Sequence, residues 1–305
     1  MKSIRTGMTP VSIFSYNAIK KPVPMKTAIC IKPGIFTTVQ DLGRIGMRRY
    51  GIGYAGVADV ASAVNANILC GNPPGAALLE CTYQGPVIKF YGSTFISVTG
   101  RNVEIIINEK TVDEKAHDVT EGDVLKLRIK EGCRAYIAFR GGINGPSIQG
   151  SRATDTVSRC CGYTIKEGAI IHTLESRVID THTLLHSPDY SNDILEAYPG
   201  PEYHLLDASD KAALVTHEWN ISSRSSRMSY MLDGNPLGIG YQNMLSGPVL
   251  PGTIQIPPSG LPIILGNDSQ TTGGYPRIGI LTPQSYQILS QKPPGSTLRL
   301  SILEE

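Results

Sequence analysis

The stretch PVIKFYGSTFISVTGRNVEIIINEKTVDEKAHDVTEGDVLKLRIKEGCRAYIAFRGGI, residues 86–143, decides the fold class. Turn residues divide it, with Glu121-Gly122-Asp123 and Glu131-Gly132 as predicted turns. Short runs rich in β-branched and aromatic residues lie between the turns, and such runs are typical of strands. The predicted strands are residues 87–90, 95–98, 103–107, 124–129 and 135–139. So many short strands with so little helix predict a barrel or a sandwich.

The sequence on either side adds more strands and a few short helices. Residues 27–32, 35–40 and 297–302 are predicted strands. Val60, Val64 and Ile68 recur at helical spacing, and Asp59 before them is suited to cap a helix over residues 59–69. Helices are also predicted over residues 209–219 and after Thr282-Pro283, where threonine can cap the helix and proline fits its first turn. The expected fold is mainly β with a few short helices.

The polar, proline-rich segment HSPDYSNDILEAYPGP, residues 186–201, is the predicted boundary between two subdomains. We expect an N-terminal β subdomain over residues 25–195 and a C-terminal β subdomain over residues 196–305. Residues 1–24 are interpreted as a poorly ordered extension, because they lack the apolar core of a signal peptide and a strand pattern begins only at Met25.

The composition excludes several classes of protein. Of the 305 residues, 41% are hydrophobic and 18% are charged, which is typical of a globular protein. A formal net charge of +2 argues against binding of nucleic acid or an anionic membrane, and no apolar run approaches the roughly 20 residues of a membrane span. The six cysteines form no CxxC pair, so we expect reduced, mostly buried thiols in a cytoplasmic protein. No metal site is predicted, and His182 and His186 are interpreted as solvated.

Four segments are rich in residues that orient small polar ligands. They are residues 37–44 (TTVQDLGR), 150–155 (GSRATD), 225–230 (SSRMSY) and the pair 251–258 (PGTIQIPP) with 267–277 (NDSQTTGGYPR). Arginine can grip a carboxylate through two parallel hydrogen bonds, and glycine lets the backbone approach a ligand closely. Such polar runs are costly to bury unless a ligand or a network satisfies them. The segments therefore predict a ligand site, although turns with local ion pairs would also explain the first and second.

Familiar catalytic motifs are missing from the sequence. It contains no GxxxxGK[ST] phosphate loop, no GxGxxG that opens a helix after a strand, no HExxH and no GxSxG. The sequence therefore indicates neither a nucleotide-binding loop nor a nucleophile.

Together, the four segments resemble the family known as allophanate hydrolase subunit 2. This family includes KipA, the C subunit of bacterial 5-oxoprolinase and the carboxyltransferase domain of urea carboxylase. The shared motifs are TTVQDLGR, GNP at residues 71–73, GGI at 141–143, GSRxTD, PGP at 199–201, PGTIQ and DxQTTGGYP. The resemblance implies a cyclophilin-like β-barrel architecture. Ser226 and Ser229 depart from the family pattern, which has Asp and Gly there, so the exact substrate transfers less safely than the fold.

The resemblance implies the C subunit of an ATP-dependent 5-oxoprolinase, which cleaves 5-oxo-L-proline to L-glutamate. Its expected partners are a B subunit similar to KipI or allophanate hydrolase subunit 1 and an A subunit of LamB/YcsF type. ATP would act through the complex, and the chain alone would be inactive. One alternative is the carboxyltransferase component of a biotin-dependent urea or amide carboxylase, with biotin supplied by another chain. Another is a non-enzymatic, KipA-like regulator that binds a kinase inhibitor protein.

Our hypothesis for the site gathers arginine, glutamine and aspartate side chains from distant segments in one cleft. Arg44, Arg227 or Arg277 would bind a carboxylate or phosphate, because each guanidinium can make paired hydrogen bonds. The residues assigned to catalysis are Asp268, Gln270 and Asp41. The residues assigned to substrate binding are Arg44, Gln40, Arg227, Tyr230, Gln255, Thr271, Thr272 and Arg277.

Overall fold

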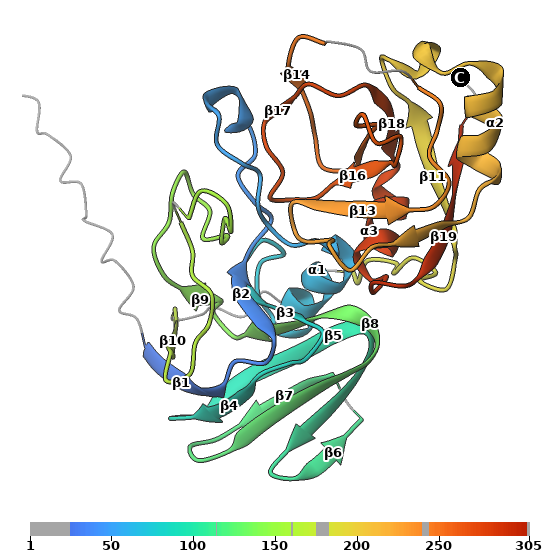
Figure 1. The fold of residues 1–305 in the computed structure, drawn as a ribbon. Helices are drawn as coiled ribbons and strands as arrows, with labels where there is room; N and C mark the ends of the chain where they lie inside the picture. Colours follow the sequence, from blue (N-terminus) through green and yellow to red (C-terminus); the bar gives the residue numbers. More distant parts are fainter. Residues whose placement is uncertain (1–24, 114, 160, 175–182, 240–243, 304–305) are drawn as a thin grey trace, which may run out of the picture.

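The computed structural model describes residues 25–303, apart from residues 114, 160, 175–182 and 240–243. The predicted N-terminal extension, His182 and Cys160 therefore lie outside the described residues. Figure 1 shows two β units, a blue-to-green sheet below and a yellow-to-red barrel above, with the first helix near their junction. Within the described residues the protein is mainly β with three short α-helices, which confirms the predicted fold class.

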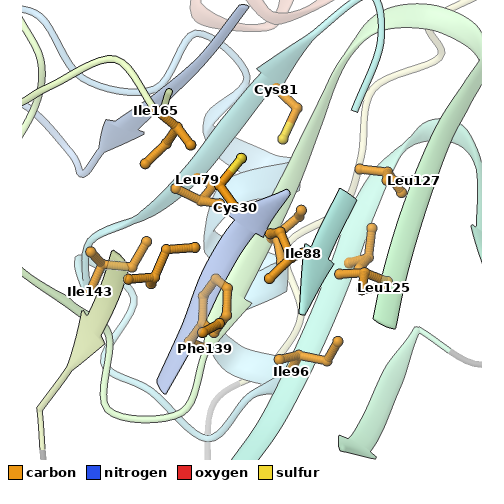
Figure 2. Packing of buried hydrophobic residues seen from close by; sticks show 14 of the residues in the cluster. Cys30, Leu79, Cys81, Ile88, Ile96, Leu125, Leu127, Phe139, Ile143 and Ile165 are labelled. Atoms are coloured by element: carbon orange, nitrogen blue, oxygen red, sulfur yellow. The ribbon is translucent and has the colours of Figure 1, made fainter. Parts of the chain in front are cut away.

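The first unit is a ten-stranded sheet that covers residues 25–173 of the chain. Its main path runs in the order β2-β3-β8-β4-β1-β10-β9, and β5 extends it by pairing with β6, β7 and β8. The strands are β1 (Met25–Lys32), β2 (Phe36–Gln40), β3 (Leu78–Thr82), β4 (Val87–Phe90), β5 (Thr94–Ile107), β6 (Lys110–Val112), β7 (Ala116–Val119), β8 (Val124–Phe139), β9 (Ile143–Asn144) and β10 (Ile170–Thr173). Figure 2 shows its apolar core, in which Phe139, Ile88 and Leu125 are fully buried.

Two of the predicted strand breaks are wrong. Residues 95–98 and 103–107 belong to one strand, β5, and residues 124–129 and 135–139 belong to one strand, β8. The predicted turn at Glu131-Gly132 is an irregularity inside β8, opposite a shift of register around Asn102. Gly132 has a φ of +79°, which glycine adopts without strain, so the strand bends while its pairing continues on both sides.

The first helix, α1 (Val60–Leu69), forms where the sequence predicts it. The Asp59 side chain caps it by accepting a hydrogen bond from the Ser62 backbone N–H. Ala63 and Ala66 pack with Leu78 and Tyr136 of the sheet, so the helix covers the end of the sheet nearest the barrel. A 3₁₀ turn, Arg48–Tyr50, lies in the loop before it.

The second unit is a closed barrel with strand order β11-β18-β15-β16-β13-β12-β19. Its strands are β11 (Ile194–Pro199), β12 (Trp219–Ile221), β13 (Ser229–Asp233), β15 (Thr253–Gln255), β16 (Ile263–Leu265), β18 (Arg277–Leu281) and β19 (Thr297–Ile302), and the short β14 (Gly247–Pro248) pairs with β17 (Thr272–Gly273) beside it. The predicted boundary at residues 195 and 196 falls inside β11. Trp219, fully buried, lies in the barrel core.

Two α-helices and a 3₁₀ turn, Tyr203–Leu205, accompany the barrel. The helix α3 (Pro283–Ser290) begins after Thr282, whose side chain accepts from the Ser285 N–H, as predicted. The predicted helix over residues 209–219 is shorter, because α2 (Ala208–Thr216) ends before Trp219 enters a strand. None of the helices in the described part of the chain has the length and apolar character needed to cross a membrane.

Candidate functional site between the two units

Loops from both units meet in a group that we call the loop cluster, comprising residues 40–58, 150–158 and 267–271. Asp41, directly after β2, organises the first contact. Its carboxylate accepts hydrogen bonds from the Gly43 N–H at 2.8 Å, the Ser151 hydroxyl at 2.8 Å and the Arg152 N–H at 2.6 Å. The first and second predicted segments therefore lie against each other, and Asp41 holds them in place.

The fourth segment joins them from the barrel. The Asp268 carboxylate accepts from the Thr156 hydroxyl at 2.5 Å, and the Asn267 carbonyl accepts from the Ala55 N–H at 3.0 Å. Arg48 donates to the Gln270 carbonyl at 2.6 Å. Segments separated by more than 200 residues thus share one cluster, as the site hypothesis expects for this part of the chain.

Arg227, two residues before β13, is the centre of an ion network in which each described partner is engaged. Its Nε and Nη2 each donate to Asp268 at 3.0 Å, and Nη2 also reaches the Gly56 carbonyl at 2.7 Å. Its Nη1 donates to Glu80. Burial alone would lower the pKa of Arg227, but Glu80 and Asp268 outweigh it and raise that pKa. Because all of these donors are engaged by protein, Arg227 links the two units rather than offering a free cation.

The sequence hypothesis missed Glu80, the second anion of this network. Glu80 lies in β3, where the whole run LLECT is buried, and its Oε2 accepts from the Ala58 N–H at 2.9 Å and the Tyr136 hydroxyl at 3.0 Å. A charged residue inside an otherwise apolar strand is the signal that could have identified it, because buried charges are rare unless they are paired.

Arg44 differs from Arg227 because it lacks such partners. Its side chain is 1% exposed, yet within the described structure its side chain makes a single hydrogen bond, from Nη2 to the Ala153 carbonyl. Its Nε and Nη1 are buried with no hydrogen-bond partner among the described residues. Burial would raise the pKa of the nearby Asp155, but hydrogen bonds from Ser158 and Val157 and the charge of Arg44 lower it. Arg44 therefore carries two unused donors.

Two further side chains of the loop cluster have unused buried atoms. Gln40 donates to Thr38 at 3.0 Å and to the Thr154 carbonyl at 3.2 Å, but its Oε1 accepts from no described residue. The Ser269 hydroxyl is likewise without a partner in the described structure. Buried polar groups in native proteins are almost always paired with protein, water or ligand. These unpartnered atoms make the loop cluster a candidate ligand site.

Several predicted residues lie elsewhere, at one end of the barrel. Arg277 makes a two-point ion pair with Glu202, at 2.9 and 2.6 Å, and donates to the Pro248 carbonyl at 2.8 Å. Gln255, its register partner in β15, donates to the Tyr275 carbonyl at 3.0 Å. Arg277 and Gln255 are thus bonded to residues of the barrel unit, and neither makes a described contact with Arg44.

The remaining predicted residues contact the cluster through the backbone or lie beside it. The Gln270 side chain is exposed, and its carbonyl is the atom that binds Arg48. The Thr271 carbonyl accepts from the Val249 N–H, and Thr272 is exposed in β17. Tyr230, in β13, is buried, and this burial raises its pKa to about 12.

Tyr230 lines a cavity of about 470 Å³ at the junction of the two units, which borders the loop cluster at Thr156 and Val157. We call it the junction cavity. Its walls come from both units and include Thr82, Arg134, Thr156, Arg227, Met228 and Tyr230. Thr156 belongs to both sites, because it lines the cavity and also donates to Asp268.

Comparison with known proteins places this architecture among relatives. Residues 50–302 match the family model of the carboxyltransferase domain, subdomains A and B. The chain is similar to the C subunit of 5-oxoprolinase from Escherichia coli K12, with 34% identity over 274 residues that make up 88% of each chain. The protein of the same name from Haemophilus influenzae is 32% identical over 268 residues, 86% of each chain.

The fold is also found within a larger enzyme. The crystal structure of the Kluyveromyces lactis urea carboxylase superposes with a TM-score of 0.81 at 24% identity, over 93% of this chain. This chain covers only 28% of that protein. At this identity, the likeness establishes a shared fold and nothing about the reaction.

Proposed function

Because this chain belongs to the carboxyltransferase domain family, subdomains A and B, we propose that it is the C subunit of an ATP-dependent 5-oxoprolinase. The complex would cleave 5-oxo-L-proline to L-glutamate. The lengths support this choice within the family, since the match with the Escherichia coli 5-oxoprolinase protein covers 88% of both chains. The urea carboxylase, by contrast, is matched over 28% of its length.

The observation that carries the proposal is the set of unused atoms in the loop cluster. 5-Oxoproline presents a carboxylate, which accepts hydrogen bonds, and a lactam N–H, which donates one. Arg44 offers two unused donors for the carboxylate, and Gln40 offers one unused acceptor for the lactam N–H. The two side chains bind the carbonyls of neighbouring residues, Ala153 and Thr154.

The loop cluster is closed, because these unused atoms are out of contact with solvent. Substrate entry therefore requires the surrounding loops to separate. Water excluded by their closing would strengthen the Arg44–carboxylate attraction. Within this proposal Asp268 and Asp41 are positioning residues, since protein donors already occupy their carboxylates.

ATP enters the proposal through the complex. When bound, it would activate the lactam oxygen by phosphorylation, so that water can open the ring. We assign no ATP site to this chain, because its sequence has no glycine-rich phosphate loop. The part of this chain would be to bind and orient the lactam.

An exposed apolar surface supports a need for partner proteins. Ile45 and Tyr50 of the first unit are 76% and 64% exposed, and Leu245 of the barrel is 95% exposed. Arg48, between the first two, donates to the Val249 and Gln270 carbonyls, which joins this loop to the barrel. Figure 1 shows the loop that precedes α1 extending beside β17. Gathered apolar side chains on a surface mark interaction sites.

The test is reconstitution with a LamB/YcsF-type protein and a KipI-like protein as the other two components. We expect ATP-dependent release of glutamate from 5-oxoproline by the three proteins together and none by this chain alone. Replacing Tyr50 and Leu245 together by Asp should prevent co-purification while leaving the thermal unfolding of the chain unchanged. Turnover by the isolated chain, or a complete complex that cannot use 5-oxoproline, would contradict the proposal.

Carboxyl transfer is the second candidate function, favoured by the match to the carboxyltransferase domain family model. Biotin would then come from another chain. The same purified complex distinguishes the two functions. Consumption of bicarbonate and urea with a biotinylated partner, and no release of glutamate, would establish carboxyl transfer in place of ring opening.

A further inference from the structure

The junction cavity has a rim of exposed apolar side chains. Ile35, Tyr83 and Val157 come from loops of the first unit, and Met228 comes from the barrel unit. They are 65%, 41%, 52% and 39% exposed, although all four are large and hydrophobic. Water contact with this much apolar surface is unfavourable. A guest with an apolar body would cover it.

The floor of the cavity is polar and has unused atoms. Arg134, in β8, is 5% exposed, and its Nη1 donates to the Ser290 carbonyl. Its Nε is buried without a hydrogen-bond partner among the described residues, and the Glu80 Oε1, at 3.8 Å, is too distant for a hydrogen bond. Thr82, in β3, also lines the floor, and its buried hydroxyl has no partner in the described structure.

The charges that face the cavity all have the same sign. Among the described residues, its lining includes Arg134, Arg227 and Lys292 and no Asp or Glu. The Glu80 carboxylate lies behind the lining, and its oxygens are engaged by Arg227, Ala58 and Tyr136. Lys292 pairs with Asp193, whose side chain is 67% exposed and therefore shared with water. The described lining therefore presents only basic side chains to an anion, while their carboxylate partners Glu80, Asp268 and Asp193 lie outside the lining.

We propose that the junction cavity binds a small organic acid with an apolar body. Its carboxylate would lie beside Arg134 and Thr82 and accept hydrogen bonds from Arg134 Nε and the Thr82 hydroxyl once these two buried side chains turn toward the cavity, and its apolar part would pack against Met228, Ile35 and Tyr230. The volume of about 470 Å³ lies within the range of sites for small ligands. The proposal does not depend on the 5-oxoprolinase assignment, because Arg44 is not among the residues that line the cavity. It can therefore be tested on the isolated chain.

Three probes with one carbon skeleton test the chemistry: 4-phenylbutanoate, 4-phenylbutanamide and 4-phenylbutylamine. Isothermal titration calorimetry on the isolated chain needs neither ATP nor a partner. We expect the acid to bind about tenfold or more tightly than the amide, and the amine to bind most weakly, because the cations of the lining repel it. Equal affinities for the three, or no binding of the acid at about 10 mM, would overturn the proposal.

Variants locate the bound probe. Met228→Trp and Ile35→Trp fill the rim at exposed positions, and each should weaken binding of the acid about tenfold or more. Ile194→Trp, on an exposed residue of β11 outside the cavity, is the matched control and should bind normally. Thr82→Val keeps the shape of the floor and should weaken the acid about fivefold. Unchanged affinity in both rim variants would place the probe elsewhere and refute the site.

Discussion

Arg227 and Arg44 are buried to a similar degree at the same junction, yet their surroundings differ. The Arg227 guanidinium donates hydrogen bonds to two carboxylates and a carbonyl. The Arg44 guanidinium has one acceptor, and two of its nitrogen atoms have no partner within the described structure. Burial of an arginine therefore does not by itself indicate a ligand site. A structural arginine has protein acceptors for its N–H groups, whereas an arginine available to a ligand keeps N–H groups without an acceptor in the folded protein.

The difference follows from what each arginine joins. Arg227 precedes a barrel strand, and its partners Glu80 and Gly56 come from the first unit, so its bonds hold the sheet and the barrel together. Arg44 lies in a loop of the first unit and binds another loop of the same unit. Loss of the first should therefore affect folding, and loss of the second should affect function.

Arg227→Met gives the largest expected effect on stability. It leaves Glu80 and Asp268 buried with too few donors, so we expect a loss of about 3–5 kcal/mol in the free energy of unfolding. Urea denaturation measures it. The matched control is Arg224→Met, whose exposed ion pair with Asp233 should be worth less than about 1 kcal/mol. Equal losses in the two variants would remove the contrast on which this comparison depends.

Arg44→Gln should separate function from folding. In the reconstituted complex we expect glutamate release to fall about 100-fold, because the substrate carboxylate loses its paired donors. Stability should change by less than about 1 kcal/mol, since only one hydrogen bond to a carbonyl is lost. Steady-state kinetics and urea denaturation on the same preparation check both parts. Full activity in this variant would show that the unused donors of Arg44 serve no substrate.

Asp268→Asn tests whether Asp268 positions the loops or takes part in the reaction. The amide cannot accept both bonds from Arg227, so we expect a loss of about 2 kcal/mol in stability. Assayed well below its unfolding temperature, the variant should keep turnover within about fivefold of the parent. A drop of about 100-fold or more in kcat with normal stability would instead make Asp268 catalytic.

Arg277→Met should give the smallest effect. Its pair with Glu202 is partly exposed and lies at the barrel end, so we expect a loss of about 1 kcal/mol or less. Glutamate release should be unchanged within about twofold, because the structure separates Arg277 from Arg44 and Gln40. A strong loss of activity would instead support the sequence hypothesis, in which Arg277 binds the substrate.

Most of the fold could be predicted because its signals are local. Asp59 and Thr282 cap helices through bonds that span three residues, and each cap is readable without knowing the rest of the chain. The continuity of β5 and β8 could not be predicted. The positive φ of Gly132 is equally suited to a turn and to a bulge, and the pairing with the opposite strand decides between them.

The site was predictable only in part. The polar segments around Asp41, Ser151 and Asp268 do meet, as their composition suggests. Glu80 and Arg134 were missed, because they lie in strands whose pattern indicates core rather than chemistry. Arg277 and Gln255 belong to a polar segment, yet their partners Glu202 and Tyr275 engage them at the far end of β15 and β18.

By itself the sequence determined the family, the mainly β class, the helix starts and the segments that would cluster, since all of these depend on neighbours in the chain or on motif order. Only the tertiary structure decided which arginine remains available and that a cavity opens between sheet and barrel. The physical reason is that a guanidinium has a fixed number of donors. How many remain for a guest depends on acceptors brought from distant parts of the chain, and Glu80 lies 147 residues from Arg227.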